Sequence, residues 1–575
     1  MSGATGFDTP HETPSLRTGT ASLRDAASAK TDSVVRLMER SIGGADQPAI
    51  GSGRGPVWPE PRTLDSRPVA RQITVRLDRR TLRGWHIRLL DQLGQRPDRR
   101  LQVEWVLGAH GLPPNAELLF RLEAAIHGLP RPGLATAAEP MAFGTYGAEV
   151  AAGEPDLVLD LSGGQVESDA VADRGQPVWR LDFDGMPGEA GLLAALFAGR
   201  APVAALRGPD GIPVAVGRLG AESHTVMLVA FEDYLARSIT LIAAALDGAA
   251  STQLPDGTAT ALQRQASFDL GGLGVSRRAA SGLARQIARR LYALCFHSPQ
   301  WRVGWRRIVG PDLIDLRRHP EGGWTDLPDD GRRFYADPFA IAHGGSVTLF
   351  VEEFDYRRGK GVISALGFDA TGPRGRPEPV LELETHLSYP FVFEADGAVW
   401  MIPESHASGT IDLYRATAFP GGWVHEAVLV DHVVAGDATL LHHDGCWWMF
   451  ATVRAGGGSY SDTLHLWRAP HFRGPWTPHP RNPVLIDVGS ARAAGPIVVR
   501  DGALIRPVQD CRRGYGAALG LARILRLDAE GYEQRVETRL GPGAAWPGSR
   551  LHMLSAAGGF EFIDGSRRAR SRLLG

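Results

Sequence analysis

The sequence predicts a multidomain protein, with an α/β domain in its N-terminal half and an all-β five-bladed propeller in its C-terminal half. Three observations lead to this prediction. The chain has 575 residues, more than the ~250–300 at which a single hydrophobic core stops growing. Strand and helix patterns alternate before about residue 250, and from Trp301 short strands separated by Gly, Pro and Asp replace them. A hairpin pattern then recurs about every 50 residues.

Composition limits the classes of function. Lys and Arg number 62 and Asp and Glu 64, a net charge of −2, which argues against a generally basic surface and against a nucleic-acid partner. Three cysteines without a CxxC pair exclude a disulfide framework (Cys295, Cys446 and Cys511). There is no run of ~18 apolar residues, and the N-terminus lacks the apolar region of a signal peptide. We therefore expect a soluble, cytoplasmic protein.

The first 250 residues divide into two parts. Residues 1–70 are rich in Gly, Ser, Thr, Pro and Ala, and we expect this segment to be disordered. The α/β domain is expected over 71–250, where strands alternate with helices and so indicate βαβ units around a mostly parallel sheet. The expected strands and helices run in this order: strand 71–77, helix 82–93, strand 101–107, helix 116–127, strands 156–161 and 177–183, then a strand and a long helix within 225–246.

Residues 251–300 combine a Gly/Ser/Thr-rich linker with a basic amphipathic helix at 276–296. In that helix basic residues lie opposite apolar ones (Arg277, Arg278, Arg285, Arg289 and Arg290 against Leu283, Ile287, Leu291 and Leu294). Two interpretations stay open: a bridging helix with a solvated basic face, or a peripheral contact with an anionic membrane or a partner. A short basic tail follows the second domain at 569–575.

A hairpin unit repeats through the C-terminal half. Four units begin at Asp337, Tyr389, Asp437 and Ala494, and a weaker fifth begins at His552. Each of the first four has a glycine eight residues after its start (Gly345, Gly397, Gly445 and Gly502). Because Asp-Gly between two apolar runs is a strong hairpin signal, units at this period predict propeller blades over 301–568. A solenoid is less favoured, since further strands fill the intervals.

The propeller topology places the candidate site. The start of each innermost strand and the end of its hairpin partner meet at one face of the central channel. We therefore expect four catalytic carboxylates to share a funnel there (Asp337, Glu404, Asp437 and Asp510). Substrate-binding residues are expected around them (Tyr335, Glu353, Tyr389, Gln509 and His552), with aromatic residues such as Tyr515 available to stack on sugar rings.

Carboxylates in a shared site can supply the general acid and base that glycosidic-bond chemistry needs. A structural alternative stays open for each, as a turn cap at Asp337 or Asp437 or as an exposed strand end at Glu353 or Glu404. Because side chains alternate along a strand, the pairs Glu352/Glu353 and Gln509/Asp510 carry an ambiguity of one residue. No cluster with metal-ligand spacing is evident, so no metal is expected.

Several motifs carry a resemblance that covers about 301–568. They are Tyr335-Ala-Asp-Pro-Phe, Tyr389-Pro-Phe-Val-Phe-Glu, Ile402-Pro-Glu-Ser, Asp412-Leu-Tyr-Arg, Trp476-Thr-Pro-His-Pro-Arg-Asn-Pro-Val, Arg506-Pro-Val-Gln-Asp-Cys and Leu551-His-Met-Leu. In these the region resembles the propeller domain at the N-terminal end of plant glucosamine inositolphosphorylceramide transferases. That domain is similar in outline to the five-bladed propellers of glycoside hydrolase family 43.

The family 43 resemblance implies a catalytic base at Asp337. It also shows two departures: Tyr389 stands where that family has the Asp that modulates the acid's pKa, and Ala494 stands where it has the acid. Glu404, Asp437 and Asp510 are the candidates to substitute. Hydrolysis by the family 43 mechanism is therefore not implied.

Residues 71–250 resemble a formyltransferase-like, Rossmann-like domain in layout. Asp156-Leu-Val-Leu-Asp-Leu-Ser-Gly-Gly stands at the position of the central strand and glycine turn. The following strand, 177–183, and its turn lack the Asn and His of the formyltransferase motif. The nearby candidates for a base or an oxyanion donor are Asp182, Asp184 and His224. The resemblance therefore implies a degenerate, non-catalytic domain.

Three functions stay open. The first is a carbohydrate-active protein of bacterial surface-glycan or glycolipid biosynthesis, with a sugar bound in the funnel. The second is a non-catalytic glycan-binding module, and the third is a sugar N-formyltransferase whose propeller binds substrate. The expected partner is a glycan or nucleotide sugar; no cofactor is assigned, use of a folate or nucleotide sugar stays open, and so does the oligomeric state.

Overall fold

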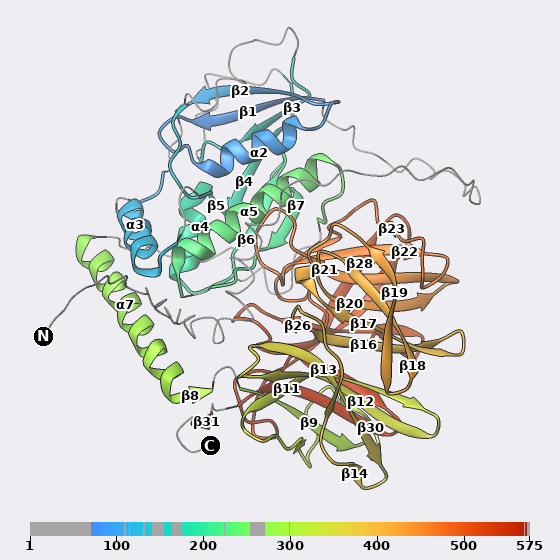
Figure 1. Cartoon of the computed structure of the whole chain (residues 1–575). Helices are drawn as coiled ribbons and strands as arrows, with labels where there is room; N and C mark the ends of the chain where they lie inside the picture. The colour runs from blue at the N-terminus through green and yellow to red at the C-terminus, as the bar shows by residue number, and fades with distance from the viewer. Residues whose placement is uncertain are drawn as a thin grey trace, which may run out of the picture. The chain divides into compact units, whose positions relative to one another are not determined.

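The computed structural model describes residues 71–107, 111–113, 115–129, 133–140, 154–163, 175–223, 225–252, 271–297, 300–567 and 570–571. An α/β domain comes first along the chain, and a propeller follows it (Figure 1). The predicted disordered segment 1–70 and most of the basic tail 569–575 lie outside the described residues.

The α/β domain is built on a single sheet with the strand order β2-β1-β3-β4-β6-β7, and β5 pairs with β4. Pairing is parallel from β2 through β1 and β3 to β4. The strands are β1 (Gln72–Asp78), β2 (Arg100–Val106), β3 (Leu157–Asp160), β4 (Val178–Phe183), β5 (Met186–Pro187), β6 (Val203–Arg207) and β7 (Pro213–Arg218). The α/β class predicted from the alternating pattern is thus confirmed.

The sheet is mixed rather than mostly parallel, which corrects the prediction. β6 pairs antiparallel with both β4 and β7. A tight turn joins β6 to β7, where the N–H of Gly208 donates to the carbonyl of Ile212 at 3.0 Å and Gly211 has φ 75°. Strands joined by so short a turn can pair only antiparallel, whereas parallel neighbours need a long crossover.

Five helices of ten or more residues lie among the described residues of the N-terminal part of the chain. Trp85, Leu89, Leu90 and Leu93 of α2 are buried, at the helical spacing seen in the sequence. The predicted basic helix is present as α7, and the described helices are α2 (Gly84–Gly94), α3 (Ala116–His127), α4 (Gly188–Phe197), α5 (Met227–Leu246) and α7 (Gly272–Cys295). The short strand β8 (Phe296–His297) follows α7 and pairs with β31 (Arg570–Ser571).

The C-terminal half forms five antiparallel sheets, so the predicted five-bladed propeller is confirmed. The first four blades follow chain order. Blade one consists of β11 (Arg333–His343), β12 (Ser346–Asp355), β13 (Lys360–Asp369), β14 (Gly372–Pro373) and β15 (Glu378–Leu381), and blade two of β16 (Ser388–Ala395), β17 (Ala398–Glu404), β18 (Ile411–Ala418) and β19 (Gly421–Val430). Blade three consists of β20 (Ala435–His443), β21 (Cys446–Val453), β22 (Thr463–Ala469), β23 (Thr477–Pro478) and β24 (Leu485–Ile486), and blade four of β25 (Val498–Arg500), β26 (Ala503–Asp510), β27 (Ala518–Leu527) and β28 (Tyr532–Leu540). Two short helices, α8 (Leu313–Leu316) and η3 (His406–Ser408), lie in its loops.

The fifth blade closes the propeller with strands from both ends of the domain. Its order is β10-β9-β30-β29, so β9 (Trp301–Arg307) and β10 (Thr325–Asp326) pair with β29 (Met553–Ala557) and β30 (Phe560–Ser566). Pairing of Ser566 with Trp301 and of Phe560 with Arg307 fixes the register. Closure leaves the propeller without a gap between its first and last blades.

The predicted hairpin turns have the backbone conformation that Asp-Gly favours. Asp396-Gly397, Asp444-Gly445 and Asp501-Gly502 all have positive φ, between 49° and 75°. Type I′ turns require this conformation at both central positions, and their twist matches that of the flanking strands. These turns therefore set the hairpin registers of three blades.

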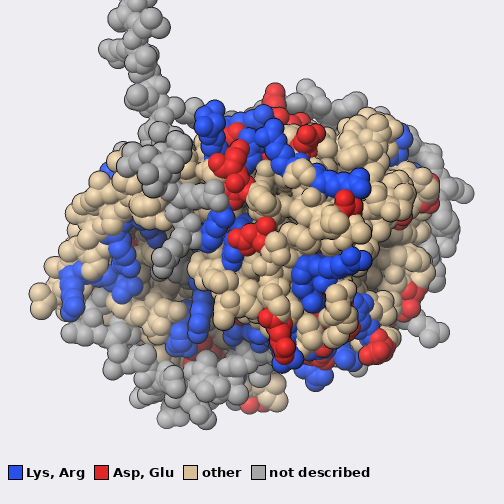
Figure 2. All heavy atoms as spheres, turned by 90° about the horizontal axis from the view of Figure 1, so that it is seen from below, with Lys and Arg blue, Asp and Glu red and all other residues tan. Residues whose placement is uncertain are grey.

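Basic and acidic side chains lie among one another on the face shown in Figure 2. Many of the arginines of the propeller pair with carboxylates, as Arg523 does with Glu537 at 2.7 Å and Arg526 with Asp528 at 2.6 Å. Such pairing keeps charge of one sign from gathering on the surface of the propeller.

Candidate functional site

Three blades begin with the same unusual backbone conformation. Asp337, Tyr389 and Asp437 have φ of 50°, 43° and 54°, in the left-handed region that non-glycine residues rarely adopt. Each lies at an irregularity of strand register in β11, β16 or β20. Bulges of this kind re-aim a side chain, and backbone strain is commonly found at functional sites. The repeat observed in the sequence is therefore also a repeat of a strained starting position.

The blade-three start, Asp437, lies in a group of four polar side chains. Arg492 donates to it twice, from Nε to Oδ2 at 2.6 Å and from Nη2 to Oδ1 at 3.1 Å. The same Nη2 donates to Glu404 Oε2 at 3.2 Å, and Gln509 Nε2 donates to Asp437 Oδ2 at 3.0 Å. Glu404 also accepts the backbone N–H of Asp437 at 3.1 Å. One guanidinium therefore holds two buried carboxylates together.

The two carboxylates differ in their tendency to hold a proton. Burial alone would raise the pKa of Glu404, but hydrogen bonding by His406 and the charge of Arg492 outweigh it and lower that pKa. Burial raises the pKa of Asp437 well above its usual value, and the charge of Glu404 adds to this effect against the opposing Arg492. Neighbouring carboxylates with opposite shifts are a common arrangement in acid–base sites.

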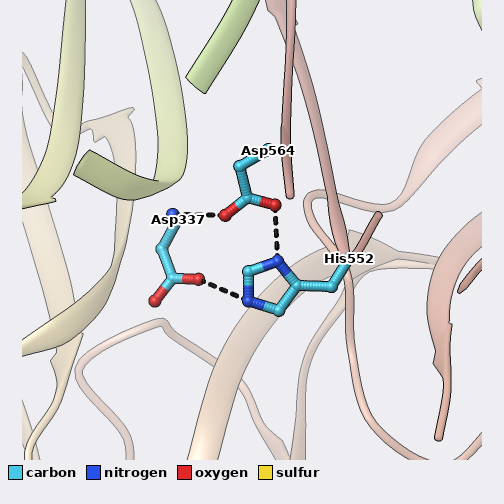
Figure 3. Close-up of side chains that lie close together, drawn as sticks. All are labelled: Asp337, His552 and Asp564. Carbon is cyan, nitrogen blue, oxygen red and sulfur yellow. Dashed lines mark hydrogen bonds and ion pairs between the residues drawn. The ribbon is translucent and has the colours of Figure 1, made fainter. Parts of the chain in front are cut away.

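The blade-one start, Asp337, lies in a second group (Figure 3). His552 contacts Asp337 Oδ1 through Nε2 at 3.2 Å and Asp564 Oδ1 through Nδ1 at 2.5 Å, and all three side chains are buried. The backbone N–H of Asp337 donates to Asp564 Oδ2 at 2.8 Å. Burial would lower the pKa of His552, but Asp564 and Asp337 raise it to about 9. The ring is therefore an imidazolium at neutral pH.

The second group also has the composition of a metal site, since one ligand atom from each residue lies within 4.8 Å of the others. Both ring nitrogens of His552 already face carboxylates. Binding of a cation would need the ring to lose its proton and one of these contacts. Asp337, His552 and Asp564 are therefore first of all a charge-balanced hydrogen-bonded group.

Two tyrosines, Tyr389 and Tyr515, lie beside these groups. The buried Tyr389 donates its backbone N–H to Asp337 Oδ2 at 3.2 Å, and its hydroxyl pairs with Thr439 and accepts the N–H of Gly495 at 3.2 Å. Tyr515 is half-buried in the loop after β26, with Arg492 4.9 Å from its ring centroid and the His552 ring at 5.3 Å. Its ring therefore contacts members of both groups.

Other predicted residues lie apart from these groups. The carboxylate of Asp510 binds Arg512 and Arg539, while Gln509 turns toward Asp437, so alternation along β26 selects Gln509 rather than the expected Asp510. Glu353 pairs with Arg333 and accepts the Ser364 hydroxyl at 2.8 Å. Tyr335 is buried in the core beside β12. Glu353 and Tyr335 therefore have other partners, whereas Tyr389 and His552 contact Asp337 and belong to the site.

Sequence reasoning missed Arg492 and Asp564. Arg492 lies two residues before a repeat start and Asp564 lies inside the second strand of the weak fifth unit. The shared spacing of the repeats identifies only the residues at the starts and ends of the hairpins, and neither Arg492 nor Asp564 has such a position. A search for cations able to neutralise the predicted carboxylates would have favoured Arg492.

In the part of the α/β domain that the structure describes, little space is left at the sheet edge where such folds bind ligands. A cavity there, lined by Trp85, His86, Ser162 and Glu189 among others, measures about 20 Å³, about the space of one water. Glu189 is bound to Arg83 and to Trp85 Nε1. Asp182 pairs with Arg207 and Asp184 accepts the N–H of Val203, while His224 lies outside the described residues.

The fold and the site define a five-bladed propeller with two linked carboxylate groups at the starts of its blades. Residues 328–558 match the family profile described as glucosamine inositolphosphorylceramide transferase 1, N-terminal. The propeller is thus a domain of the type found in that family.

Curated relatives carry the same name. The protein of Oryza sativa subsp. japonica is 34% identical over 274 residues, which cover 45% of this chain and 36% of the rice protein. The Arabidopsis thaliana protein is 32% identical over 248 residues, covering 41% of this chain and 32% of that protein. The chain therefore spans about a third of the length of these relatives.

Among solved structures, Zg3597, a family 117 glycoside hydrolase from Zobellia galactanivorans, has 13% identity and a TM-score of 0.31, with 46% of this chain and 90% of that chain covered. A GH43_1 enzyme from Xanthomonas citri has 11% identity and a TM-score of 0.30, with 41% and 89% covered.

Proposed function

We propose that the propeller binds a sugar-containing substrate beside Asp337, Glu404 and Asp437 and carries acid–base chemistry on it. The observation behind this proposal is the pair Glu404 and Asp437, which share Arg492 and have pKa values shifted in opposite directions. Such a pair can share one proton and pass it to a substrate oxygen. The name of the plant relatives, glucosamine inositolphosphorylceramide transferase, supports a sugar-containing substrate.

In this proposal Asp437 supplies the proton and Asp337 is held as an anion. Asp337 keeps its charge because it faces the His552 imidazolium, and an anionic carboxylate can act as a base or stabilise developing positive charge. Arg492 and Gln509 keep the Asp437 carboxyl in a single orientation. Tyr515, beside both groups, offers an aromatic face for a sugar ring.

The biological setting is also part of the proposal: assembly of a bacterial surface glycan or glycolipid, in the cytoplasm. The two relatives described above are plant proteins, so they support the chemistry of the substrate rather than this setting. The three cysteines are not joined by disulfides, which fits a reducing compartment. Fractionation of the native host, with the protein found in the cytoplasmic or the inner-membrane fraction, would support this location; recovery outside the cell would contradict it.

The test is a comparison of carboxamide variants on purified full-length protein. Nucleotide sugars and inositol-containing glycolipids are screened by calorimetry for binding and by mass spectrometry for product. Asp437→Asn and Glu404→Gln are expected to reduce turnover roughly 100-fold or more while binding changes a few-fold. Asp510→Asn is the matched control, since that carboxylate binds Arg512 and Arg539 instead of the site. Unchanged turnover in Asp437→Asn would refute the proposal.

A non-catalytic glycan-binding module is the second candidate. It is favoured by one observation: non-acidic residues, Tyr389 and Ala494, start blades two and four, where family 43 enzymes have carboxylates. Saturable sugar binding without any product in the screen above would favour this candidate.

The third candidate, a sugar N-formyltransferase, has less support in the described residues. The cavity at the sheet edge measures about 20 Å³, and the Glu189 carboxylate in its lining is already bound. Binding of tetrahydrofolate at micromolar concentration, measured by calorimetry, would revive it.

A further inference from the structure

Helix α7 turns an apolar stripe outward. Leu283, Ile287, Leu291 and Leu294 recur at three- and four-residue spacing and so line one side of the helix. In this order, the four residues are 47%, 50%, 59% and 68% exposed to solvent. Leu273, earlier in the same helix, is 86% exposed. A stripe of this kind normally faces a protein core.

The other side of α7 packs on the α/β domain. Val275 is buried in the core of that domain, and the Arg278 guanidinium lies 4.5 Å from the centroid of the Phe197 ring. Arg289 Nη2 donates to Thr225 Oγ1 at 3.3 Å. Figure 1 shows α7 beside α3, and residues of the two helices contact each other. The orientation of α7 is therefore set by this packing, and it leaves the apolar stripe on the outer side.

The charge of α7 has one sign only. The helix contains five arginines and neither Asp nor Glu (Arg277, Arg278, Arg285, Arg289 and Arg290). Arg277 and Arg290 are exposed, and helical spacing places them on either side of the apolar stripe. Arginines beside an apolar stripe can keep their guanidinium groups at the level of lipid phosphates while the stripe enters the acyl region.

We propose that α7 is a membrane-surface helix that lies flat on an anionic lipid bilayer, with Leu283, Ile287, Leu291 and Leu294 inserted below the headgroups. The exposed Arg277 and Arg290 beside the stripe favour a negatively charged partner, and the apolar stripe favours one with an apolar interior. The helix of 24 residues is about 36 Å long, and the stripe from Leu283 to Leu294 runs along about 17 Å of it. No described helix has the length and apolar character needed to cross a bilayer. The proposal holds whether or not the propeller acts on a sugar.

Vesicle flotation of the full chain tests this inference. The probes are vesicles of phosphatidylcholine alone and of phosphatidylcholine with phosphatidylglycerol. We expect flotation with the anionic vesicles, weakened by high salt, and little with the neutral ones. The double variant Ile287→Glu/Leu291→Glu should lower the bound fraction roughly tenfold or more, because two charges would have to enter the acyl boundary. Arg277→Gln/Arg290→Gln should lower it on anionic vesicles only.

Matched controls separate this effect from a general loss of surface hydrophobicity or of folding. Ile212→Glu and Val499→Glu change apolar residues that are 61% and 59% exposed on other elements, and they should float like the unchanged protein. Thermal melting should be the same for all variants, since the changed residues are exposed. Equal flotation with neutral and anionic vesicles, or equal losses in the controls, would overturn the proposal. A further contrary result would be a protein that binds no vesicles but forms a dimer, and whose dimer dissociates in Ile287→Glu/Leu291→Glu. In that case a second copy of the chain would cover the stripe.

Discussion

Arg492 is the residue on which the Asp437 group depends. Its guanidinium contacts Asp437 twice and Glu404 once, and all three side chains are nearly excluded from solvent. Two carboxylates of like sign in one buried place would repel each other without it. The same residue also stacks near Tyr515, which links it to the His552 side of the site.

Replacement of Arg492 should therefore destabilise the fold. We expect Arg492→Met to lower the free energy of unfolding by about 3–5 kcal/mol, because it leaves two buried carboxylates without a cation. Arg492→Lys should lower the free energy of unfolding by less, since lysine keeps the positive charge and loses only the two-point contact with Asp437. Urea denaturation at neutral pH measures both. Arg526→Met, at an exposed ion pair, is the control and should stay within about 0.5 kcal/mol; an equal loss there would contradict the assignment.

His552 makes stability depend on pH in a definite direction. Its pKa is raised to about 9 in the folded protein, above the ordinary value of 6.5. A raised pKa means that the charged ring stabilises the fold fully below about pH 6.5 and that this contribution is lost as the pH rises through about 9. The largest contribution to expect is about 3 kcal/mol.

Denaturation curves between pH 6 and 10 check this effect, with Asp337→Asn as the comparison. Removal of the Asp337 charge should lower the pKa of His552, so the loss of stability should begin at lower pH in the variant. A profile with the same midpoint in both proteins would show that His552 is not the group responsible.

At the scale of elements, the hairpin turns set each blade. The turn glycines have positive φ and little around them, as at Gly445, where φ is 71° and an added Cβ would meet nothing within 4 Å. A substitution there therefore tests backbone conformation alone. Gly367, within β13, is also open around its Cβ position but lacks a positive φ, so it forms a matched control.

We expect Gly445→Ala to lower the free energy of unfolding by about 1 kcal/mol, because alanine is strained in the left-handed region. Gly367→Ala should be neutral or slightly stabilising, since alanine restricts the unfolded chain more than glycine does. Thermal melting of both variants and of the unchanged protein measures the two changes in stability. A larger loss at Gly367 would mean that the strand, rather than the turn, carries the constraint.

At the scale of the whole molecule, the propeller depends on contacts between residues far apart in the sequence. In the fifth blade Glu561 of β30 accepts the N–H of Leu313 at 2.8 Å and pairs with Arg306 of β9 at 2.7 Å. These contacts join the two ends of the domain over about 250 residues of chain. The blade closes only when both ends are in place.

Glu561→Ala should accordingly lower the free energy of unfolding by about 2–4 kcal/mol, because it leaves a buried N–H and a guanidinium without their acceptor. Glu561→Gln keeps a neutral hydrogen-bond acceptor and should therefore lower the free energy of unfolding by less. The exposed Glu533→Ala is the control and should stay within about 0.5 kcal/mol. Limited proteolysis should cut the first variant faster near residues 301–326; protection equal to that of the control would contradict a closing role.

The sequence by itself determined the blades. The Asp-Gly and Gly-Gly turns and the apolar runs around them are local signals that predict the hairpins, and the alternation of strand and helix patterns predicts the α/β class. The repeat also pointed to Asp337, Tyr389 and Asp437 as blade starts, since equal spacing implies equivalent positions. The alternation of side chains along a strand limited the residue that faces the site to Gln509 or Asp510, but it did not decide between the two.

Only the tertiary structure decided which of these residues meet. The partners of the blade starts, Arg492 and Asp564, come from other blades, and a short-range pattern carries no information about contacts across 55 or 227 residues. The antiparallel edge of the N-terminal sheet and the outward stripe of α7 depend in the same way on packing. Local conformation follows from neighbouring residues, whereas charge pairing and the exposed side of a helix follow from what the rest of the chain places beside them.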